Sequence, residues 1–206
     1  MPPANTDHTI PSDGRRARSA RSRQAVVSSY LELVAETGRQ PTIEEVAEAA
    51  DISVRSVYRL FPDADSLIRA AVTDRADALR PLLQVDVAPT AALPARITAL
   101  VAKRARAYDQ VQAFRSVVKG QLHLHPAVAE LLEESRAALR SQAVALFGKE
   151  LSKRTGAARN DLVEAVELVT GWSAWDALRR EQGLSAARAR RVVESSVLAL
   201  LTSNKF

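Results

Sequence analysis

The sequence predicts an all-α protein, with a small N-terminal domain of short helices and a larger C-terminal helical domain. Apolar residues recur at the 3.6-residue spacing of helices over most of the 206 residues. The chain is rich in Ala, Leu and Arg, which are strong helix formers, and it contains only seven glycines. The hydrophobic share of 47% is enough for a packed core.

The composition excludes several classes of site. The chain has no cysteine, which rules out disulfides, zinc–thiolate sites and thiol catalysis. No apolar run reaches about 18 residues, so no transmembrane helix and no membrane partner are expected. The first 16 residues lack the apolar core of a secretory signal, and we therefore expect a cytoplasmic protein. The net charge of +5 and the pI of about 10.0 permit a nucleic-acid partner.

Residues 1–20 are predicted to form a disordered basic arm. The first 14 residues contain three prolines and several small polar residues. An arginine cluster follows, made of Arg15, Arg16, Arg18, Arg21 and Arg23. Such a cluster is typical of a solubilising tail. Directly before a DNA-binding domain, it is also typical of an arm that contacts phosphates or enters a minor groove.

Two short helices joined by a tight turn are expected after an opening helix at residues 21–36. Thr42 and Glu45 have the spacing of a capping box, which predicts a helix over residues 42–49. Ser53 is placed to cap a second helix over residues 53–60. A helix pair of this kind, with a polar outer face on the second helix, is the arrangement of a helix-turn-helix.

From about Arg21 to Leu67 the chain resembles the DNA-binding domain of the TetR family of transcriptional regulators. The most specific part of the resemblance is its ending, formed by Ser53, Val57, Tyr58, Arg59, Phe61 and Leu67. Two positions depart from the family pattern. Asp51 stands where the family usually has Gly in the turn, and Ala64 stands where it usually has Lys. Asp tolerates a left-handed conformation, so the turn is still expected, whereas the phosphate contact of the Lys is not.

The resemblance implies a DNA-binding domain over residues 21–67 and an effector-binding and dimerisation domain over residues 81–206. A fourth helix, starting at Pro62 and Asp63 and running to about residue 80, is expected to connect them. The apolar spacing then predicts a loop at 84–94, a helix over 95–108, a break at Asp109 and Gln110, a short helix ending near Gly120, a connector at 121–126 and a helix over 126–151.

The last two helices are expected at residues 161–182 and from Ser185 to about residue 201. Asp161 and Glu164 have capping-box spacing, and Gly183 ends the first of the two. Both helices carry surplus apolar surface, which suits a four-helix interface made from two copies of each. TetR-like proteins dimerise at this position. The predicted interface residues of a homodimer are Leu168, Trp175, Val193, Val197 and Leu200.

The predicted DNA contacts lie mainly on the outward side of the helix at 53–60. They are Arg21, Thr42, Ser53, Val54, Arg55, Ser56, Tyr58 and Arg59. An ordinary solvated helix face has the same kind of composition, but the full motif favours DNA contact. Arg55 is the best candidate for reading a base, since its guanidinium matches guanine O6 and N7. Val54 is expected to meet a thymine methyl, and Tyr58 and Thr42 to bind phosphate. Arg59 either binds phosphate or pairs with an acid of its own domain.

The candidates for a ligand pocket are Tyr108, Phe114, Gln121, His123, Trp172 and Trp175. His123 and His125 are two residues apart, which suits two metal ligands on a strand but not on a helix. No third ligand is near in sequence, so no metal is expected. The resemblance places this connector beside the effector pocket. Trp172 and Trp175 are favoured as core or interface residues, with ligand contact as the alternative.

No catalytic motif is present: there is no glycine-rich phosphate loop, nucleophile elbow or HExxH helix. The chain is therefore predicted to be no enzyme and to need no cofactor. The resemblance implies a homodimeric transcriptional regulator, usually a repressor, that binds a near-palindromic operator in double-stranded DNA and is released by a small-molecule effector. The alternative is an effector-free DNA-binding architectural or partner-binding protein whose C-terminal domain only dimerises.

Overall fold

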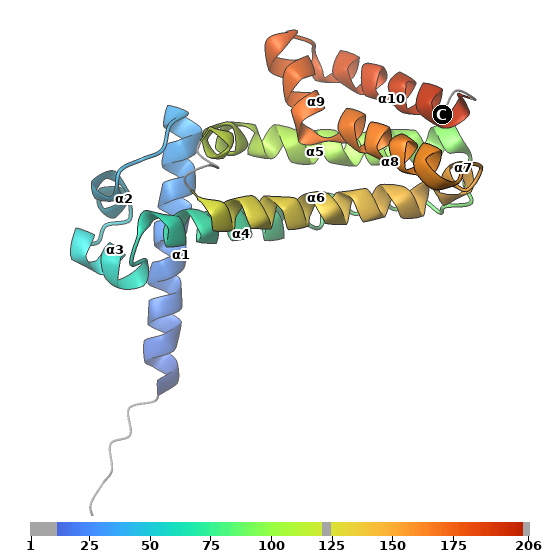
Figure 1. The fold of residues 1–206 in the computed structure, drawn as a ribbon. Coiled ribbons are helices and arrows are strands. Elements are labelled where there is room, and N and C mark those ends of the chain that lie inside the picture. The colour runs from blue at the N-terminus through green and yellow to red at the C-terminus, as the bar shows by residue number, and fades with distance from the viewer. Residues whose placement is uncertain (1–11, 121–124, 204–206) are drawn as a thin grey trace, which may run out of the picture. The chain divides into compact units, whose positions relative to one another are not determined.

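The computed structural model describes residues 12–120 and 125–203, and Figure 1 shows them as helices joined by short loops. No strand occurs within these residues. The chain divides into two compact units, unit 1 (Met1–Ala71) and unit 2 (Val72–Phe206). The all-α fold class predicted from the helical spacing is confirmed.

Unit 1 is formed by three helices and the first turns of a fourth. α2 (Ile43–Ala49) and α3 (Val54–Leu60) pack on each other and on α1 (Ser12–Thr37), and α4 (Ala64–Leu79) begins in this unit. The buried apolar residues of the unit are Val26, Val27, Tyr30, Leu31, Val34, Val46, Ala47, Val57, Phe61, Leu67, Ile68 and Ala71. Burial raises the pKa of the Tyr30 hydroxyl to about 12, as expected for a phenol inside an apolar core.

The caps predicted for the helix pair are present. The Thr42 hydroxyl accepts a hydrogen bond of 3.2 Å from the Glu45 amide, and the Glu45 carboxylate accepts one of 2.8 Å from the Thr42 amide. Ser53 caps α3 in the same way through the amide of Ser56. Between the helices, Asp51 adopts a left-handed conformation with φ of 53°. The turn thus forms with Asp in the place of glycine, as predicted.

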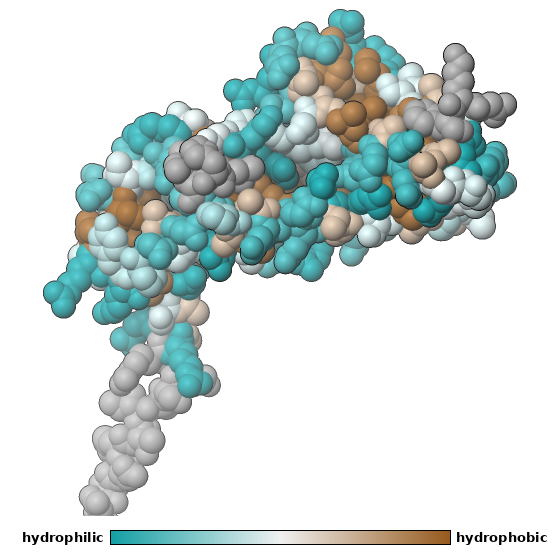
Figure 2. Space-filling model, in the orientation of Figure 1, coloured by the Kyte–Doolittle hydropathy of each residue, from teal (hydrophilic) through white to brown (hydrophobic). Residues whose placement is uncertain are grey.

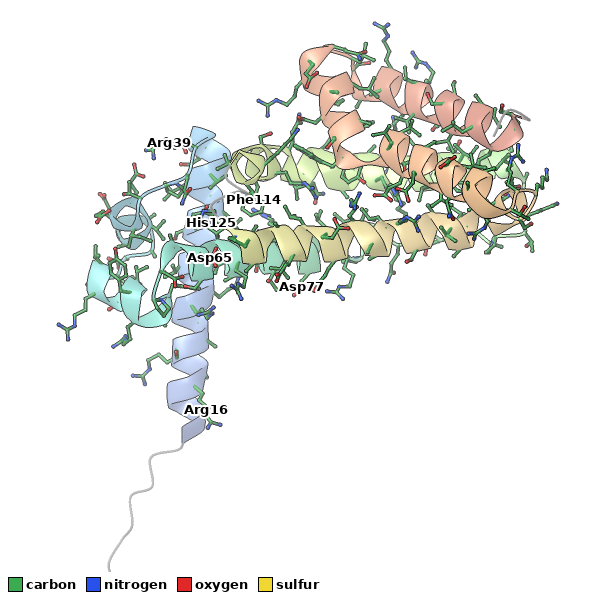
Figure 3. The ribbon with its side chains drawn as sticks, in the orientation of Figure 1. Arg16, Arg39, Asp65, Asp77, Phe114 and His125 are labelled. Carbon is green, nitrogen blue, oxygen red and sulfur yellow. The ribbon has the colours of Figure 1, made fainter. Side chains whose placement is uncertain are left out.

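The first helix is longer than predicted. α1 begins at Ser12 rather than near Arg21, so residues 12–20, predicted as part of a disordered arm, are helical; residues 1–11 lie outside the described residues. Arg and Ala favour helix strongly, and no proline follows position 11 in this segment. Burial contributes little to the formation of these first turns, because the side chains of Arg16, Arg18 and Arg21 are exposed. Figure 3 shows Arg16 near the start of α1, directed away from the helix.

Unit 2 packs long helices around one large core. Its elements are the end of α4, then α5 (Leu93–Lys119), α6 (Pro126–Leu146), α7 (Gly148–Leu151), α8 (Gly156–Thr170), α9 (Trp172–Asp176), the π-helical turn η2 (Ala177–Glu181) and α10 (Ala186–Thr202). The core combines apolar residues from five of these helices, including Leu100, Phe147, Leu162 and Val197. A second, smaller cluster joins α5, α9 and α10 around Tyr108, Trp172, Trp175 and Ala189.

Four predicted helix boundaries in unit 2 are wrong. α5 continues through Asp109 and Gln110, because these exposed residues lie on the outside of an unbroken helix. α8 begins at Gly156, before the predicted start at Asp161. It ends at Gly171, whose extended backbone separates α8 from α9. A Cβ at position 171 would lie only 3.0 Å from a backbone oxygen, so the tight break suits glycine.

A buried ion pair lies at the fourth altered boundary, where α6 stops at Leu146 and α7 follows. The Arg96 guanidinium binds the Glu150 carboxylate at 2.6 and 2.8 Å and also donates to the Leu146 carbonyl at 2.7 Å. Both side chains are almost fully buried. The Arg96 hydrogen bonds hold the pKa of Glu150 below its usual range. Arg96 therefore satisfies a carbonyl at the end of α6 while it fastens α7 to α5.

Candidate DNA-binding surface and ligand site

The exposed side of α3 carries three polar side chains on one helical face. Arg55, Tyr58 and Arg59 have the i, i+3, i+4 spacing that aligns side chains along a helix, and we call them the α3 outer face. Val57 points the other way and is fully buried. Tyr58 is 49% exposed, which is unusual for an aromatic side chain without a partner. The helix is thus anchored by Val57 and presents a polar, aromatic face.

Both arginines of the α3 outer face are available to an outside partner. Arg55 and Arg59 are exposed and make no ion pair or side-chain hydrogen bond with any residue that the structure describes. Glu44 and Glu48 lie on α2, and neither forms an ion pair with Arg55 or Arg59. Arg59 was predicted to bind phosphate or pair with an acid of its own unit. The second possibility has no support among the described residues.

Other predicted DNA contacts take part in the local structure. The Thr42 hydroxyl is engaged in the α2 cap. The Ser53 hydroxyl binds the Ser56 amide at 3.2 Å and lies 3.0 Å from the Ser56 hydroxyl. Val54 is half-buried at the first position of α3, and Arg21 is exposed on α1. The cap thereby orients the N-terminus of α3, where orphan amides and the helix dipole favour an anion.

Arg23, predicted as part of the basic arm, contacts α3 instead. Its guanidinium donates a hydrogen bond of 2.7 Å to the Leu60 carbonyl at the end of α3. The same group lies 4.1 Å from the centre of the Phe61 ring. The sequence carries no signal for this contact, because 37 residues separate the partners. Arg23 therefore supports the end of the helix whose other side is exposed.

An ion pair braces the start of α2. Arg39 donates hydrogen bonds of 2.5 and 2.9 Å to the two carboxylate oxygens of Glu45, which also belongs to the α2 capping box. The hydrogen bonds from Arg39, and then that from the Thr42 amide, lower the pKa of Glu45 to about 2. The carboxylate is therefore ionised at neutral pH and holds the loop between α1 and α2 to the cap. Figure 3 shows Arg39 beyond the end of α1.

In unit 2 the structure brings together three of the six predicted ligand residues. Tyr108 of α5 and Trp172 and Trp175 of α9 belong to one buried cluster. Phe114 is buried on α5 but lies outside that cluster. Figure 3 labels Phe114 on α5 and His125 at the start of α6. Gln121 and His123 lie outside the described residues.

A small cavity adjoins the cluster. Its volume is about 10 Å³, and its lining includes Arg104, Tyr108, Thr170 and Trp175. That space is about what one water molecule requires, whereas a drug-sized ligand needs roughly 300 Å³ or more. A small-molecule ligand at this position therefore requires some movement of the helices around it.

Arg104 is a buried cation that the sequence analysis did not single out. It donates hydrogen bonds of 2.6 Å to the Thr170 hydroxyl and 2.6 Å to the Leu139 carbonyl. Tyr108 donates to the Thr170 carbonyl at 3.2 Å. Burial lowers the pKa of Arg104 and raises that of Tyr108. The sequence indicated the burial of Arg104 only through its position, four residues before Tyr108 on the inner side of α5.

The predicted dimer residues divide into buried and exposed groups. Trp175, Val193 and Val197 lie in the core of their own chain, and their place in a dimer interface stays a prediction. Leu200 is partly buried against the same core. Leu168 on α8 is 69% exposed, and Val192 and Leu198 on α10 are exposed as well. Figure 2 shows hydrophobic residues reaching the surface around this end of unit 2.

Two further observations concern the described residues only. No three His, Cys, Asp or Glu residues within 12–120 and 125–203 gather as metal ligands. No described helix is long and apolar enough to cross a membrane.

The fold is shared with known transcriptional regulators. A TetR-family transcriptional regulator from Streptomyces coelicolor superimposes with a TM-score of 0.69 at 21% identity, over 88% of this chain and 80% of that one. A transcriptional regulator from Rhodococcus sp. Rha1 gives a TM-score of 0.67 at 17% identity, over 87% of this chain and 96% of that one. No protein-family model and no curated protein sequence matches the chain significantly. At these identities the likeness establishes a common fold, with an N-terminal helix-turn-helix and a helical C-terminal part.

Proposed function

We propose that the protein is a DNA-binding transcriptional regulator that acts as a homodimer and responds to a small molecule bound by unit 2. The α3 outer face is the observation that carries this proposal. It presents two guanidinium groups without a partner among the described residues, and an exposed phenol, on a short helix whose N-terminus is capped. Such a helix fits the major groove of DNA.

Each residue of the α3 outer face has a role in this proposal. Arg55, in the first turn, is placed to read guanine through O6 and N7. Tyr58 and Arg59, one turn later, contact phosphates and fix the register of the helix. The exposed arginines of α1, Arg16, Arg18 and Arg21, add phosphate contacts that depend on salt but not on base sequence. DNA affinity and DNA specificity thus come from different helices.

A homodimer would contain two copies of α3. Two copies of α3 placed about 34–36 Å apart would reach successive major grooves of a near-palindromic operator. The exposed apolar side chains Leu168, Val192 and Leu198 on α8 and α10 supply a surface for such pairing. Apolar side chains of this size gain free energy when a partner removes them from water.

The effector part of the proposal concerns unit 2. A ligand changes DNA binding only through its different affinities for two conformations of the dimer. The small volume of the cavity near Tyr108 favours the alternative, an effector-free DNA-binding protein. The buried guanidinium of Arg104, which lines this cavity and forms no ion pair with a described residue, favours a ligand.

Selection of bound duplexes from a random pool tests the proposal. A regulator is expected to enrich one near-palindromic sequence, with two protomers per duplex and a specificity ratio of about a thousandfold or more over a scrambled duplex. A ratio near one, or no enriched sequence, would rule out the regulator. A single protomer bound per duplex would rule out the dimer alone.

A further inference from the structure

One face of α5 carries three positive charges toward the cluster around the two tryptophans. Tyr108 follows Arg104 by four residues and Arg115 follows it by eleven, a spacing that brings all three to one side of the helix. The Arg115 guanidinium lies 5.0 Å from the centre of the Trp172 ring, and the Lys119 ammonium lies 5.6 Å from it. Trp172 itself is 6% exposed.

Neither Arg104 nor Arg115 forms an ion pair with a described carboxylate; Asp109, the carboxylate at this cluster, accepts a hydrogen bond of 2.9 Å from Trp175 Nε1. The hydrogen bonds of Arg104 go to a hydroxyl and to main-chain carbonyls, none of which carries a full charge. Arg115 is half-buried and has no hydrogen bond or ion pair with a described residue, and desolvation lowers its pKa. Glu167 acts on Arg104 from a distance, but Arg136 and Arg140 bind its carboxylate. A buried guanidinium without a counter-charge is costly, unlike the paired Arg96 of the same helix.

Two donors at this position are also unsatisfied. The Nε of Arg104 and the Nε1 of Trp172 are buried and have no hydrogen-bond partner. Arg104 lines the cavity together with Tyr108 and Trp175, and only 3% of its surface is exposed. Buried donors without partners are rare in folded proteins, and each one calls for an explanation. An anion would accept hydrogen bonds from such donors and would also offset the positive charge of Arg104.

We propose that unit 2 binds a small carboxylate with an apolar or aromatic body between α5 and α9, with Arg104 and Arg115 as its binding residues. The inference rests on the proposed function, because it names the chemical class of the effector. The Nε of Arg104, which has no partner, and the guanidinium fork of Arg115 suit the oxygens of a carboxylate. The rest of the cavity lining suits the body of the molecule: Val101, Ala105, Val169, Trp175 and Val193.

The backbone around α9 provides the means of opening. Gly171, extended, precedes α9, and the π-helical turn η2 follows it. A five-residue helix between two irregular segments moves more easily than one embedded in a continuous helix, and π-helical turns often occur at functional sites. Displacement of α9 would enlarge the 10 Å³ cavity without disturbing the larger core around Phe147.

Tryptophan fluorescence of the whole protein tests the inference. The chain has two tryptophans, and both belong to this cluster, so their emission reports on it directly. The probes are 2-naphthoate and decanoate, each paired with its neutral amide. We expect saturable binding of at least one carboxylate, and binding of its amide weaker by about ten- to a hundredfold, the effect of losing a charge-assisted hydrogen bond.

Variants of α5 give the residue-level test. Arg115→Gln is expected to weaken carboxylate binding about tenfold or more and to remove the preference over the amide, whereas Arg115→Lys keeps part of it. Arg106→Gln removes a positive charge from an exposed position on the same helix and should leave binding unchanged. Circular dichroism melting confirms that each variant is folded. Because Arg115 makes no hydrogen bond to a described residue, its replacement is not expected to unfold unit 2.

Three outcomes would overturn the inference: no saturable binding of either carboxylate at millimolar concentration, equal binding of acid and amide, or wild-type binding by Arg115→Gln. DNA selection on the same samples separates the two proposals. An enriched operator without carboxylate binding overturns the anion site alone. Carboxylate binding without sequence-specific DNA binding leaves the anion site standing and removes the regulator.

Discussion

The guanidinium of Arg23 donates a hydrogen bond of 2.7 Å to the main-chain carbonyl of Leu60, the last residue of α3. This contact ties the basic helix α1 to the end of the helix proposed to enter DNA. The final carbonyls of a helix lack partners within the helix, and a positive charge there also complements the helix dipole. Arg23 thus stabilises the orientation of α3 from within the protein, although it lies in the same cluster as the arginines proposed to contact phosphate.

Replacing Arg23 and Arg21 should therefore have different effects. Arg23→Gln is expected to lower the free energy of unfolding of unit 1 by about 1–2 kcal/mol, through the lost hydrogen bond and ring contact. It should leave the salt dependence of DNA binding unchanged. Arg21→Gln should leave stability unchanged and reduce the log–log salt slope by about one. Urea denaturation measures the free energy of unfolding, and DNA-binding isotherms at several salt concentrations measure the salt slope. The reverse pattern would assign the phosphate contact to Arg23.

The left-handed Asp51 predicts a stabilising substitution. With φ of 53°, Asp51→Gly removes steric strain that costs roughly 1 kcal/mol, part of which is offset by the greater freedom of glycine in the unfolded chain. Asp51→Ala, the matched control, should destabilise by up to about 1 kcal/mol, since alanine lacks the tolerance of Asp for this region. Thermal unfolding measures both variants. If glycine and alanine had the same effect, backbone strain at the turn would not be the cause.

The Glu45 ion pair predicts how the stability of unit 1 depends on pH. Its folded pKa of about 2 lies below the ordinary value of 4.5, mainly because Arg39 binds the carboxylate. The stability that the Glu45 ion pair gives to unit 1 is therefore fully present above pH 4.5 and is lost as the pH falls from there toward about 2. Glu45→Gln should flatten the pH dependence across this window. Equal slopes for wild type and Glu45→Gln in acid would assign the pH dependence to other carboxylates.

The buried pair of Arg96 and Glu150 predicts non-additive effects in unit 2. Arg96→Met leaves the Glu150 carboxylate buried without a partner, so it is expected to cost about 3–5 kcal/mol. The double variant Arg96→Met, Glu150→Leu should recover most of that loss, because no charge remains buried. Chemical denaturation of the four proteins gives the coupling free energy. Additive losses would show that the two residues act independently.

The parts of the fold that local sequence signals specify could be predicted. Thr42 with Glu45, and Ser53, define the starts of α2 and α3, because caps depend on residues three positions apart. The contacts of Arg23 with Leu60 and of Arg104 with Thr170 could not be predicted, since they join residues 37 and 66 positions apart. The apolar spacing of α8 to α10 could not distinguish the protomer core from an outer face. Val193 and Val197, which are predicted at an interface, are buried in their own chain, whereas Val192 and Leu198 are exposed.

Arg55 provides the most direct test of the central claim, that α3 reads DNA sequence. The measurement is a selection of bound duplexes from a random pool, carried out in parallel with wild type, Arg55→Ala and Arg59→Ala. Arg55→Ala should relax the preference at one base pair of each half-site, a loss of about 1–3 kcal/mol of discrimination there. Arg59→Ala should keep the wild-type sequence preference and bind all duplexes more weakly. An unchanged preference profile for Arg55→Ala, with affinity lowered equally for every sequence, would contradict base reading by Arg55.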